Sequence, residues 1–351
     1  MKKLSFWEGK RVFVTGHTGF KGSWLCKTLE TVGAEVTGYA LEPSSGSNLY
    51  DLCKPAVISV IGDIRDFDTL SAAFSKANPE IVIHMAAQPL VIDSYKMPRY
   101  TYDVNVMGTV NLLECARLYG NVKSVLNVTT DKVYFNLERE SGYSEGEKLC
   151  GSDPYSNSKS CSEHVTSAYV WSYFGQASVA VSTARSGNVI GGGDFSANRL
   201  VPDCADSLAR GEVIKVRNPE SVRPYIHVLD TVFAYLLIVE SQYSDPSVAG
   251  AYNIGPVADE CVTNQDLVDM FCDAWGGEAK WKHVPVETPP ESKLLKLDCS
   301  RIESVLGWRP KWDTLRAVRE AAEWYSEYYQ DGSADVIMLR QIEGFMEDAV
   351  Q

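Results

Sequence analysis

The stretch RVFVTGHTGFKG, residues 11–22, decides the fold class of this 351-residue chain. Residues 11–15 form a short apolar run typical of a buried strand, and they lead directly into three glycines spaced three apart. After these glycines, Leu25, Leu29 and Val32 repeat at helical spacing until Gly33. The sequence therefore predicts a strand, a glycine turn and a helix in direct succession.

The glycine turn has the form expected of a phosphate-binding loop. Without side chains at Gly16, Gly19 and Gly22, backbone N–H groups and the helix N-terminus can approach a pyrophosphate closely. A glycine-rich turn can also exist without a ligand, but here the strand before it and the helix after it supply the context of a dinucleotide fingerprint. We predict a bound dinucleotide held by Gly16, Thr18, Gly19, Phe20, Lys21 and Gly22.

Apolar runs and helical patterns continue to alternate beyond the turn. Strand-like runs lie at 36–41, 57–61, 81–86, 125–129 and 179–184, and helical patterns such as 70–77 and 104–119 separate them. Strands that are apolar throughout and alternate with helices form parallel sheets covered on both faces. The predicted fold class is α/β, with a Rossmann doubly wound parallel sheet and a smaller mixed α/β domain.

The pattern changes after Arg185, and the change sets the expected domain boundaries. Turns rich in glycine and proline extend to Pro224, and helical segments follow at 229–240, 264–275 and 315–329. We predict a dinucleotide-binding domain at 1–185, to which the chain returns at 226–255. A substrate-binding domain made of 186–225 and 256–351 is expected to lie over the carboxyl edge of the sheet.

The end of the second predicted strand favours NAD over NADP. An acidic residue about 20 residues after the turn would bind the adenosine ribose, and Glu42 is the only acid near that position. No arginine lies there to hold a 2′-phosphate. Asp63 and Ile64, after the third predicted strand, are expected to contact the adenine, although Asp63 can equally be a carboxylate that caps its own loop.

Composition and charge disfavour several classes of partner. The chain has 33 Lys and Arg against 46 Asp and Glu, and its formal net charge of -13 repels nucleic acids and anionic membrane surfaces. Its nine cysteines include no C-x-x-C pair and follow no metal-site spacing, which is typical of reduced thiols in a cytosolic protein. The sequence shows neither a signal-peptide core nor an apolar stretch of about 18 residues, so we expect a cytoplasmic location.

Tyr155 and Lys159 form the first half of a candidate catalytic group. Asp153 is a helix cap and Pro154 a first helical residue, so the spacing of four places Tyr155 and Lys159 on one helix face. A phenol with a pKa of about 10 is a poor base at neutral pH unless a cation such as Lys159 stabilises the phenolate. A Y-x-x-x-K pattern alone is more often a solvated face, and only the predicted nucleotide-binding sheet favours catalysis.

Thr130, Asp131 and Lys132 form the second half of the group. They follow the apolar run 125–128, which places them at the carboxyl end of a strand, where open parallel sheets bind ligands. In an unknown fold, a strand-ending Thr-Asp turn would be the simpler interpretation. Together with Tyr155, these residues predict a catalytic site that faces the cofactor.

The motifs, in this order, resemble the nucleotide-sugar branch of the extended short-chain dehydrogenase/reductase family. The resemblance covers almost the whole chain and rests on the glycine turn, Met85-Ala86-Ala87, Asn105, Thr130, Tyr155-x-x-x-Lys159 and Leu306-Gly307-Trp308-x-Pro310. Longer strings at 16–24, 129–134, 185–194 and 223–230 are similar to those of the CDP-glucose 4,6-dehydratases within this branch.

The resemblance implies an NAD-dependent lyase that converts CDP-D-glucose into CDP-4-keto-6-deoxy-D-glucose, a step toward the dideoxy sugars of bacterial O-antigen. Tyr155 would take the proton of the C4 hydroxyl, Thr130 would bind the same oxygen, and Lys159 would hold the phenolate and the nicotinamide ribose. Asp131 would protonate the departing C6 hydroxyl.

The resemblance also implies further contacts and an assembly. It places Ala86, Ala87 and Gln88 against the cofactor. It places the substrate against Asn188, Arg199, Leu200, Arg223 and Asn253, where an arginine fork suits phosphate oxygens. By the same analogy we expect a homodimer or homotetramer, with contacts through the helices at 104–119 and 154–174.

Three residues depart from the pattern of the family. Related dTDP-glucose and GDP-mannose dehydratases carry Glu as the C5 base where this chain has Lys132, and a protonated lysine cannot accept a proton. Either the pKa of Lys132 is lowered enough for it to act as the base, which we favour narrowly, or Lys132 stabilises the enolate while another group moves the proton. His17 and Lys21 replace small or apolar residues, and we expect them to change the affinity for NAD.

Two alternative functions stay open at this point. Another nucleotide-sugar 4,6-dehydratase or a 4-epimerase would share Thr130, Tyr155 and Lys159, but an epimerase has no use for an acid at 131. A non-catalytic protein that senses NAD would share the fold, but such proteins tend to lose the Tyr and the Lys that this chain keeps.

Overall fold

A seven-stranded parallel sheet forms the centre of the computed structural model, which describes residues 5–175, 179–276, 279–285 and 292–347. Its strands run in the order β11-β6-β5-β4-β1-β2-β3, and each neighbouring pair is parallel. They are β1 (Arg11–Thr15), β2 (Glu35–Ala40), β3 (Ile58–Ile61), β4 (Ile81–His84), β5 (Ser124–Val128), β6 (Ala180–Ser186) and β11 (Ala251–Ile254). The predicted doubly wound α/β fold is confirmed.

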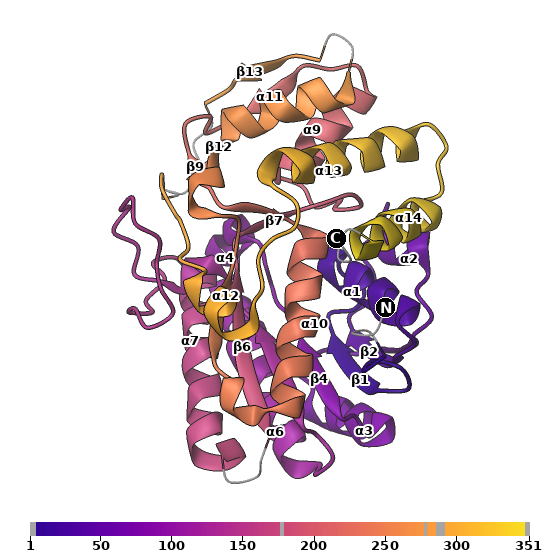
Figure 1. Ribbon diagram of the computed structural model, residues 1–351, viewed down its shortest axis with the longest axis vertical. Coiled ribbons are helices and arrows are strands. Elements are labelled where there is room, and N and C mark those ends of the chain that lie inside the picture. The colour runs from indigo at the N-terminus through magenta and orange to yellow at the C-terminus, as the bar shows by residue number, and fades with distance from the viewer. Residues whose placement is uncertain (1–4, 176–178, 277–278, 286–291, 348–351) are drawn as a thin grey trace.

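Helices cover both faces of the sheet, which explains why its central strands are apolar throughout. Along β1, Val12 and Val14 belong to one core and Phe13 to the other, because successive side chains of a strand point to opposite faces. The helices α1 (Phe20–Thr31) and α10 (Val228–Ser244) pack on the first face. The second face is covered by α3 (Phe67–Ala77), α6 (Gly108–Leu118) and α7 (Pro154–Tyr169), as Figure 1 shows.

Short elements lengthen or interrupt these helices. The π-helical segments η1 (Asp103–Met107) and η3 (Val170–Phe174) adjoin α6 and α7, so each of the predicted helices at 104–119 and 154–174 contains one change from α-helical to π-helical winding.

Several short helices lie between the longer elements. They are α2 (Leu49–Cys53), α4 (Val91–Lys96) and α5 (Pro98–Tyr102). The 3-10 turns are η2 (Asp131–Val133), η4 (Pro246–Val248) and η5 (Ala258–Glu260).

A smaller mixed unit lies over the carboxyl ends of the sheet. Its helices α9 (Leu200–Ala209), α11 (Asn264–Trp275) and α13 (Thr314–Tyr329) are seen at the top of Figure 1. The chain also forms α12 (Ser300–Leu306), which packs beside α10 and β11, and α14 (Ala334–Glu347), which packs beside α1 and α2. Three strand pairs connect the helices of the unit: β7 (Asn188–Ile190) with β10 (Tyr225–His227), β8 (Ile214–Val216) with β13 (Trp281–His283), and β9 (Val222–Arg223) with β12 (Val262–Thr263). Between these segments, α10 and β11 return to the central sheet.

The strand order reverses between β1 and β4, and the ends of these two strands are tied together. Thr15 Oγ1 accepts hydrogen bonds from the backbone N–H groups of Met85 and Ala86, both at 3.1 Å. Gly16 has a φ of +78°, and a Cβ there would lie 2.8 Å from the Ala86 nitrogen. Only glycine therefore allows the glycine turn to lie against the end of β4. A crevice at such a reversal is the usual ligand site of open α/β sheets.

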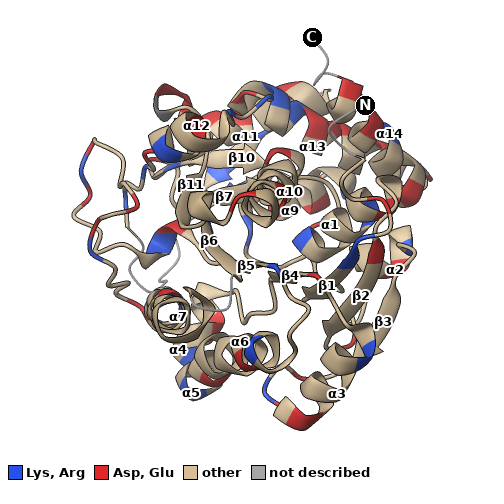
Figure 2. Cartoon of the chain, turned by 60° about the horizontal axis from the view of Figure 1, so that its bottom comes forward, with Lys and Arg blue, Asp and Glu red and all other residues tan. Residues whose placement is uncertain are grey.

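Charged residues are spread over the surface, and red acidic segments mark the outer helices α13 and α14 in Figure 2. Across the part of the chain that the structure describes, no helix combines the length and the apolar character needed to cross a bilayer.

Gly192 is a packing position at which a larger residue does not fit. Its carbonyl accepts a hydrogen bond from Trp24 Nε1 at 3.0 Å, and a Cβ would overlap the ring of Trp324 on α13. We expect Gly192→Ala to lower the free energy of unfolding by about 1–3 kcal/mol, the usual cost of overpacking a core. Urea unfolding followed by tryptophan fluorescence measures this change.

Gly120→Ala is the matched control, because a Cβ there meets no atom within 4 Å. We expect its free energy of unfolding to stay within about 0.5 kcal/mol of the wild-type value. Equal stability of the two variants would show that α13 moves aside without cost.

Candidate active site

Two adjoining cavities lie along the carboxyl ends of the central strands. The first, of about 290 Å³, is lined by the glycine turn and by the loops after β2, β3 and β4, and we call it the turn cavity. The second, of about 310 Å³, is lined by residues after β4, β5 and β6 together with α9 and β8, and we call it the α9 cavity. Lys21, Pro89, Asp194 and Arg199 line both, so the two cavities meet at these residues.

The turn cavity brings together most of the residues predicted to bind the cofactor. Its lining includes Gly16, Thr18, Gly19, Phe20, Lys21, Gly22, Asp63, Ile64, Ala86 and Ala87. Gln88 lies outside the lining, because its backbone N–H donates to Asn105 Oδ1 at 2.8 Å and its side-chain amide to Thr101 Oγ1 at 3.0 Å. Gln88 therefore holds the loop after β4 in place and does not face the cavity.

The glycine turn fits a pyrophosphate. A Cβ at Gly22 would overlap the carbonyl oxygen of Gly16, so α1 can pack directly on the turn only because position 22 is glycine. Within α1, all of whose residues are described, there is no side-chain N-cap and no acid in the first turn. The positive end of this helix is therefore available to an anion in the turn cavity.

Asp63 and His17 have specific roles beside this cavity. The carboxylate of Asp63 accepts hydrogen bonds from Arg65 Nη2 at 2.6 Å and from its backbone N–H at 2.9 Å, and these contacts hold the pKa of Asp63 below its usual value. The side chain of Asp63 therefore caps its own loop, as one of the two interpretations of the sequence expected. His17 is buried, packs its ring against Gly38 and hydrogen-bonds Ser59 Oγ at 2.8 Å, so only Lys21 of the two unusual turn residues faces the cavity.

Four of the predicted catalytic residues line the α9 cavity: Thr130, Asp131, Lys132 and Tyr155. The first three follow β5, and Tyr155 lies in the first turn of α7, where Pro154 is at N1 and Asp153 caps the helix through Ser156 N at 2.9 Å. Lys159 lies one turn further along α7, outside both linings, and its Nζ donates to the Val128 carbonyl at 2.8 Å. The structure therefore does not show the predicted contact between Lys159 and the phenol.

Burial dominates the titration of these groups. It raises the pKa of Tyr155 to about 12, although the hydrogen bond with Thr130 and the nearby Arg199 act in the opposite direction. It lowers the pKa of Lys159 to about 8. It also lowers the pKa of Lys21 to about 7, helped by the positive charges of Arg199 and Lys159. The phenol is neutral in this arrangement, and Lys159 keeps most of its charge at neutral pH.

Asp131 has the properties of a buried acid. Its Oδ1 accepts a hydrogen bond from Thr130 Oγ1 at 3.0 Å, and its Oδ2 has no hydrogen-bond partner among the residues that the structure describes. Burial raises its pKa, although the nearby Lys132 and the hydrogen bond from Thr130 oppose the increase. A carboxyl group that keeps its proton to higher pH can donate it to a leaving oxygen.

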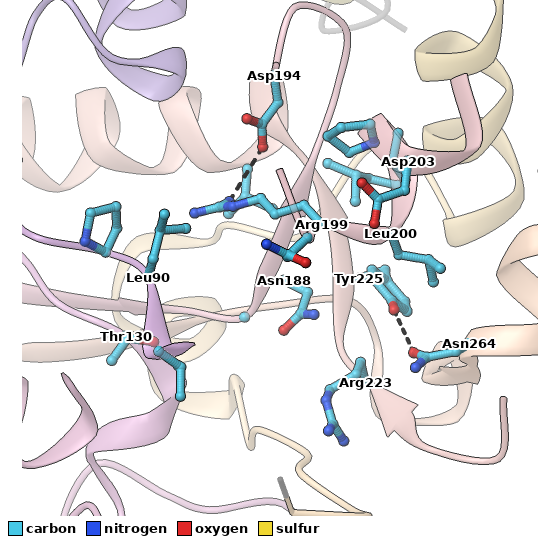
Figure 3. A pocket seen from close by; sticks show the side chains of 18 of the residues that line it. Leu90, Thr130, Asn188, Asp194, Arg199, Leu200, Asp203, Arg223, Tyr225 and Asn264 are labelled. Atoms are coloured by element: carbon cyan, nitrogen blue, oxygen red, sulfur yellow. Dashed lines mark hydrogen bonds and ion pairs between the residues drawn. The ribbon is translucent and has the colours of Figure 1, made fainter. Parts of the chain in front are cut away.

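The α9 cavity also contains four of the predicted substrate residues. Figure 3 shows Asn188, Arg199, Leu200 and Arg223 around it. Arg199 forms an ion pair with Asp194 at 3.4 Å, and Arg223 donates to the carbonyls of Val222 at 2.9 Å and Ser292 at 2.5 Å.

Asn253, the fifth predicted substrate residue, does not reach the cavity. It is buried in β11, accepts a hydrogen bond from Tyr134 Oη at 2.6 Å and donates to the carbonyls of Tyr143 at 2.7 Å and Asp298 at 2.9 Å. Its side chain thus joins three segments of the chain beside the sheet.

The sequence did not single out several residues that line the α9 cavity. They are Leu90, Asp194, Asp203, Lys215, Arg217, Asn218 and Asn264. Two spacings could have indicated some of them. Asp203 follows Arg199, the N-cap residue of α9, by four residues. Lys215 and Arg217 are two apart, so they share one face of the strand β8 and its extension.

A buried ion pair between α7 and β6 fixes the position of the carboxyl end of β5. Glu163 of α7 accepts hydrogen bonds from Arg185 Nε at 2.9 Å, Arg185 Nη2 at 3.0 Å and the hydroxyls of Thr129 at 2.5 Å and Thr183 at 2.8 Å. Because Thr129 immediately precedes Thr130 and Asp131, this cluster fixes where β5 delivers the two residues.

Comparisons with known proteins agree with this geometry. The family model described as GDP-mannose 4,6 dehydratase matches residues 13–321. The CDP-glucose 4,6-dehydratase of Salmonella typhimurium is 42% identical over 350 residues, which cover 97% of this chain and 98% of that protein. The dTDP-glucose 4,6-dehydratase of Streptomyces antibioticus is 29% identical over 330 residues, which cover 90% of this chain and 92% of that protein. The structure of the UDP-glucose 4-epimerase of Thermus thermophilus in complex with NAD aligns with a TM-score of 0.79 at 27% identity. The alignment covers 90% of this chain and 98% of the epimerase chain.

Glu163→Gln tests the buried cluster. The variant leaves the charge of Arg185 buried without its counter-ion, and we expect it to lower the free energy of unfolding by about 3–5 kcal/mol. Denaturant unfolding measures the loss. As a control, Glu327→Gln removes the exposed ion pair with Arg340 and should cost less than about 1 kcal/mol. Similar losses in both variants would contradict a special role for the buried pair.

Proposed function

Because the chain belongs to the GDP-mannose 4,6-dehydratase family, we propose that it is an NAD-dependent lyase that dehydrates CDP-D-glucose to CDP-4-keto-6-deoxy-D-glucose. The observation that carries this proposal is the position of Asp131, a buried acid hydrogen-bonded to Thr130 in the cavity that Tyr155 lines. A 4-epimerase needs no acid there, whereas a dehydratase must protonate a leaving hydroxyl. The 42% identity with a CDP-glucose enzyme over nearly the whole chain supports CDP-D-glucose as the substrate.

NAD is the cofactor, and the residues of the turn cavity suit it. The backbone of residues 16–22 and the N-terminus of α1 would hold the pyrophosphate, and Asp63, Ile64, Ala86 and Ala87 border the rest of the cavity. When bound, NAD would supply the acceptor for a hydride from C4 of the sugar and the donor of that hydride to C6, so the reaction would involve no net redox change.

The side chains of the α9 cavity move the protons. Tyr155 Oη would remove the proton of the C4 hydroxyl only as a phenolate, so its pKa of about 12 must fall when ligands bind. Arg199 already acts in that direction, and Lys159 would add a second positive charge. Thr130 Oγ1 would hydrogen-bond the same C4 oxygen. The C5 proton becomes acidic next to the C4 ketone. Asp131 would then donate its proton to the C6 hydroxyl, which leaves as water. Burial raises the pKa of Asp131, which favours its protonated form relative to an exposed carboxylate.

The centre of the α9 cavity would hold the diphosphate of the substrate. Arg199 and Arg223 supply positive charge there, and α9 begins at Leu200 with its N-terminus at the cavity wall. Asn188, at the start of β7, adds a polar side chain on the same wall.

A panel of nucleoside-diphosphate sugars tests the proposed function. The protein, supplied with NAD, would be incubated with CDP-, dTDP-, UDP- and GDP-glucose and with GDP-mannose. We expect CDP-glucose to give the 4-keto sugar, detected by its ultraviolet absorbance in alkali, with the highest kcat/KM of the five. Dehydration of only dTDP- or GDP-sugars would overturn the substrate assignment, and a 4-epimer without the keto sugar would overturn the reaction.

Lys132 is proposed as the C5 base, and two variants separate this role from simple charge stabilisation. Lys132→Ala removes both the amine and its charge, whereas Lys132→Arg keeps the charge in a group that is not a base near neutral pH. If Lys132 is the base, both variants slow C5 deuterium incorporation from heavy water by about 10²–10⁴-fold. Wild-type exchange in Lys132→Ala, or in Lys132→Arg alone, would eliminate the base role.

We also propose a homodimer through α6 and α7, which could pair further into a homotetramer. Large apolar side chains are exposed on and beside these helices: Met107 at 49%, Leu118 at 52%, Trp171 at 90% and Tyr173 at 48%. An apolar surface of this kind favours a protein interface. A cytoplasmic location is proposed as well, since all nine cysteines are free thiols.

Light scattering tests the assembly. We expect Trp171→Glu to halve the mass of the dimer, because a carboxylate would be buried in the interface. Val336→Glu, at an exposed position on α14, should leave the mass unchanged. A wild-type monomer, or an unchanged mass in Trp171→Glu, would contradict this interface.

A further inference from the structure

We infer that Asp203 selects the base of the nucleotide sugar, by accepting a hydrogen bond from the exocyclic amine of cytosine. This inference deepens the proposed function and rests on it. It concerns the end of the α9 cavity that lies farthest from the reacting sugar.

The residues that line the α9 cavity fall into three regions, one at each side and one between them. In Figure 3, Thr130 lies on one side, Asp203 on the opposite side, and Asn188 and Arg199 between them. A nucleoside diphosphate-sugar has the same order of parts. With the sugar at Thr130 and the diphosphate at Arg199, the base lies beside Asp203.

The walls at this end of the cavity come from three elements. Asp203 lies in the first turn of α9, Lys215, Arg217 and Asn218 lie on and after β8, and Asn264 begins α11. Asn264 Oδ1 is occupied by the hydroxyl of Tyr225 at 2.6 Å. Asp203 thus supplies the only carboxylate from these elements in the lining, and a carboxylate is solely an acceptor of hydrogen bonds.

The carboxylate of Asp203 stays partly exposed although it accepts a hydrogen bond from the backbone of Asn198, because Arg217 does not cover it. Arg217 Nη2 donates to the Asn198 carbonyl at 2.8 Å and Nη1 to its Oδ1 at 3.3 Å, whereas Nη2 lies 3.9 Å from Asp203 Oδ2. The guanidinium is therefore anchored on Asn198 and reaches Asp203 only as a long ion pair. The side chain of Asp203 is 40% exposed, on the cavity wall.

The pyrimidine bases differ in the group that such a carboxylate would meet. Cytosine has an amine at C4, which donates hydrogen bonds, whereas uracil and thymine have a carbonyl oxygen there. Asp203 would bind the amine and repel the carbonyl, so a single side chain supplies both attraction to the correct base and rejection of the others. A simpler role also exists, because an acid in the first turn of a helix stabilises its positive end.

Asp206, which lies beyond the first turn of α9, provides a control for the loss of one negative charge from this helix. It lies on the same helix, pairs with Arg210 one turn away and does not line the cavity. Asp203→Asn and Asp206→Asn therefore remove the same charge from α9, but only the first changes the cavity wall.

The experiment compares kcat/KM for CDP-glucose and UDP-glucose in the wild type and both variants. We expect Asp203→Asn to reduce the preference for CDP-glucose by about ten- to a hundredfold, because its amide can donate to the uracil carbonyl. The change should lie mainly in KM, since Asp203 is remote from Thr130 and Tyr155. Asp206→Asn should keep the wild-type preference. Asp203→Ser, which cannot repel the carbonyl by charge, should also lose preference and serves as a second variant if Asp203→Asn does not fold.

The outcomes distinguish this inference from the proposed function. If the wild type dehydrates CDP-glucose preferentially and both Asp203 variants keep that preference within twofold, the role of Asp203 is overturned and the proposed function stands. Equal loss of preference in Asp206→Asn would likewise overturn it in favour of a general effect of charge on α9. If the wild type does not dehydrate CDP-glucose, the proposed function fails and the inference fails with it.

Discussion

The close contact between the end of β1 and the end of β4 is the constraint on which the rest of the structure depends. Thr15 Oγ1 accepts hydrogen bonds from the backbone of residues 85 and 86, and Gly16 lies so close to Ala86 that no side chain fits. This contact places the glycine turn beside the loop after β4. Both cavities lie along the edge that it fixes, and β5 and α7 then place Thr130, Asp131 and Tyr155 next to them.

The local charge of the site is opposite to that of the whole chain. The protein has a formal net charge of -13, yet the lining of the α9 cavity contains Lys21, Lys132, Arg199, Lys215, Arg217 and Arg223 against Asp93, Asp131, Asp194 and Asp203. Cations held in a partly buried cavity act on a bound anion far more strongly than distant surface acids, which water and salt screen. The net charge therefore describes the outer surface, whereas the charge that a ligand meets in the site depends on the residues that line the cavity.

Sequence patterns predicted the long elements well and the short ones poorly. The apolar runs of β1, β4 and β5 and the helices α11 and α13 lie within two residues of their expected bounds. The pairs β8–β13 and β9–β12 have two or three residues per strand, too few for a periodic signal. The helix α14 also went unnoticed. In the site, adjacency in sequence predicted the group from Thr130 to Lys132 and the glycine turn, whereas Gln88, Lys159 and Asn253 lie outside the cavity linings and donate hydrogen bonds to other parts of the protein.

The sequence by itself determined the class of the fold, the family and the chemical groups of the site, because these depend on local spacing: strand, glycine turn, helix, and Tyr155 in the first turn of α7. Only the tertiary structure decided which groups share a cavity and how each one titrates. Asp131 becomes an acid because it is buried, Asn253 is removed from the cavity by its bonds across β11, and Asp203 meets Arg217 only when α9 packs beside β8. Burial and long-range packing involve residues far apart in the chain, which no local pattern records.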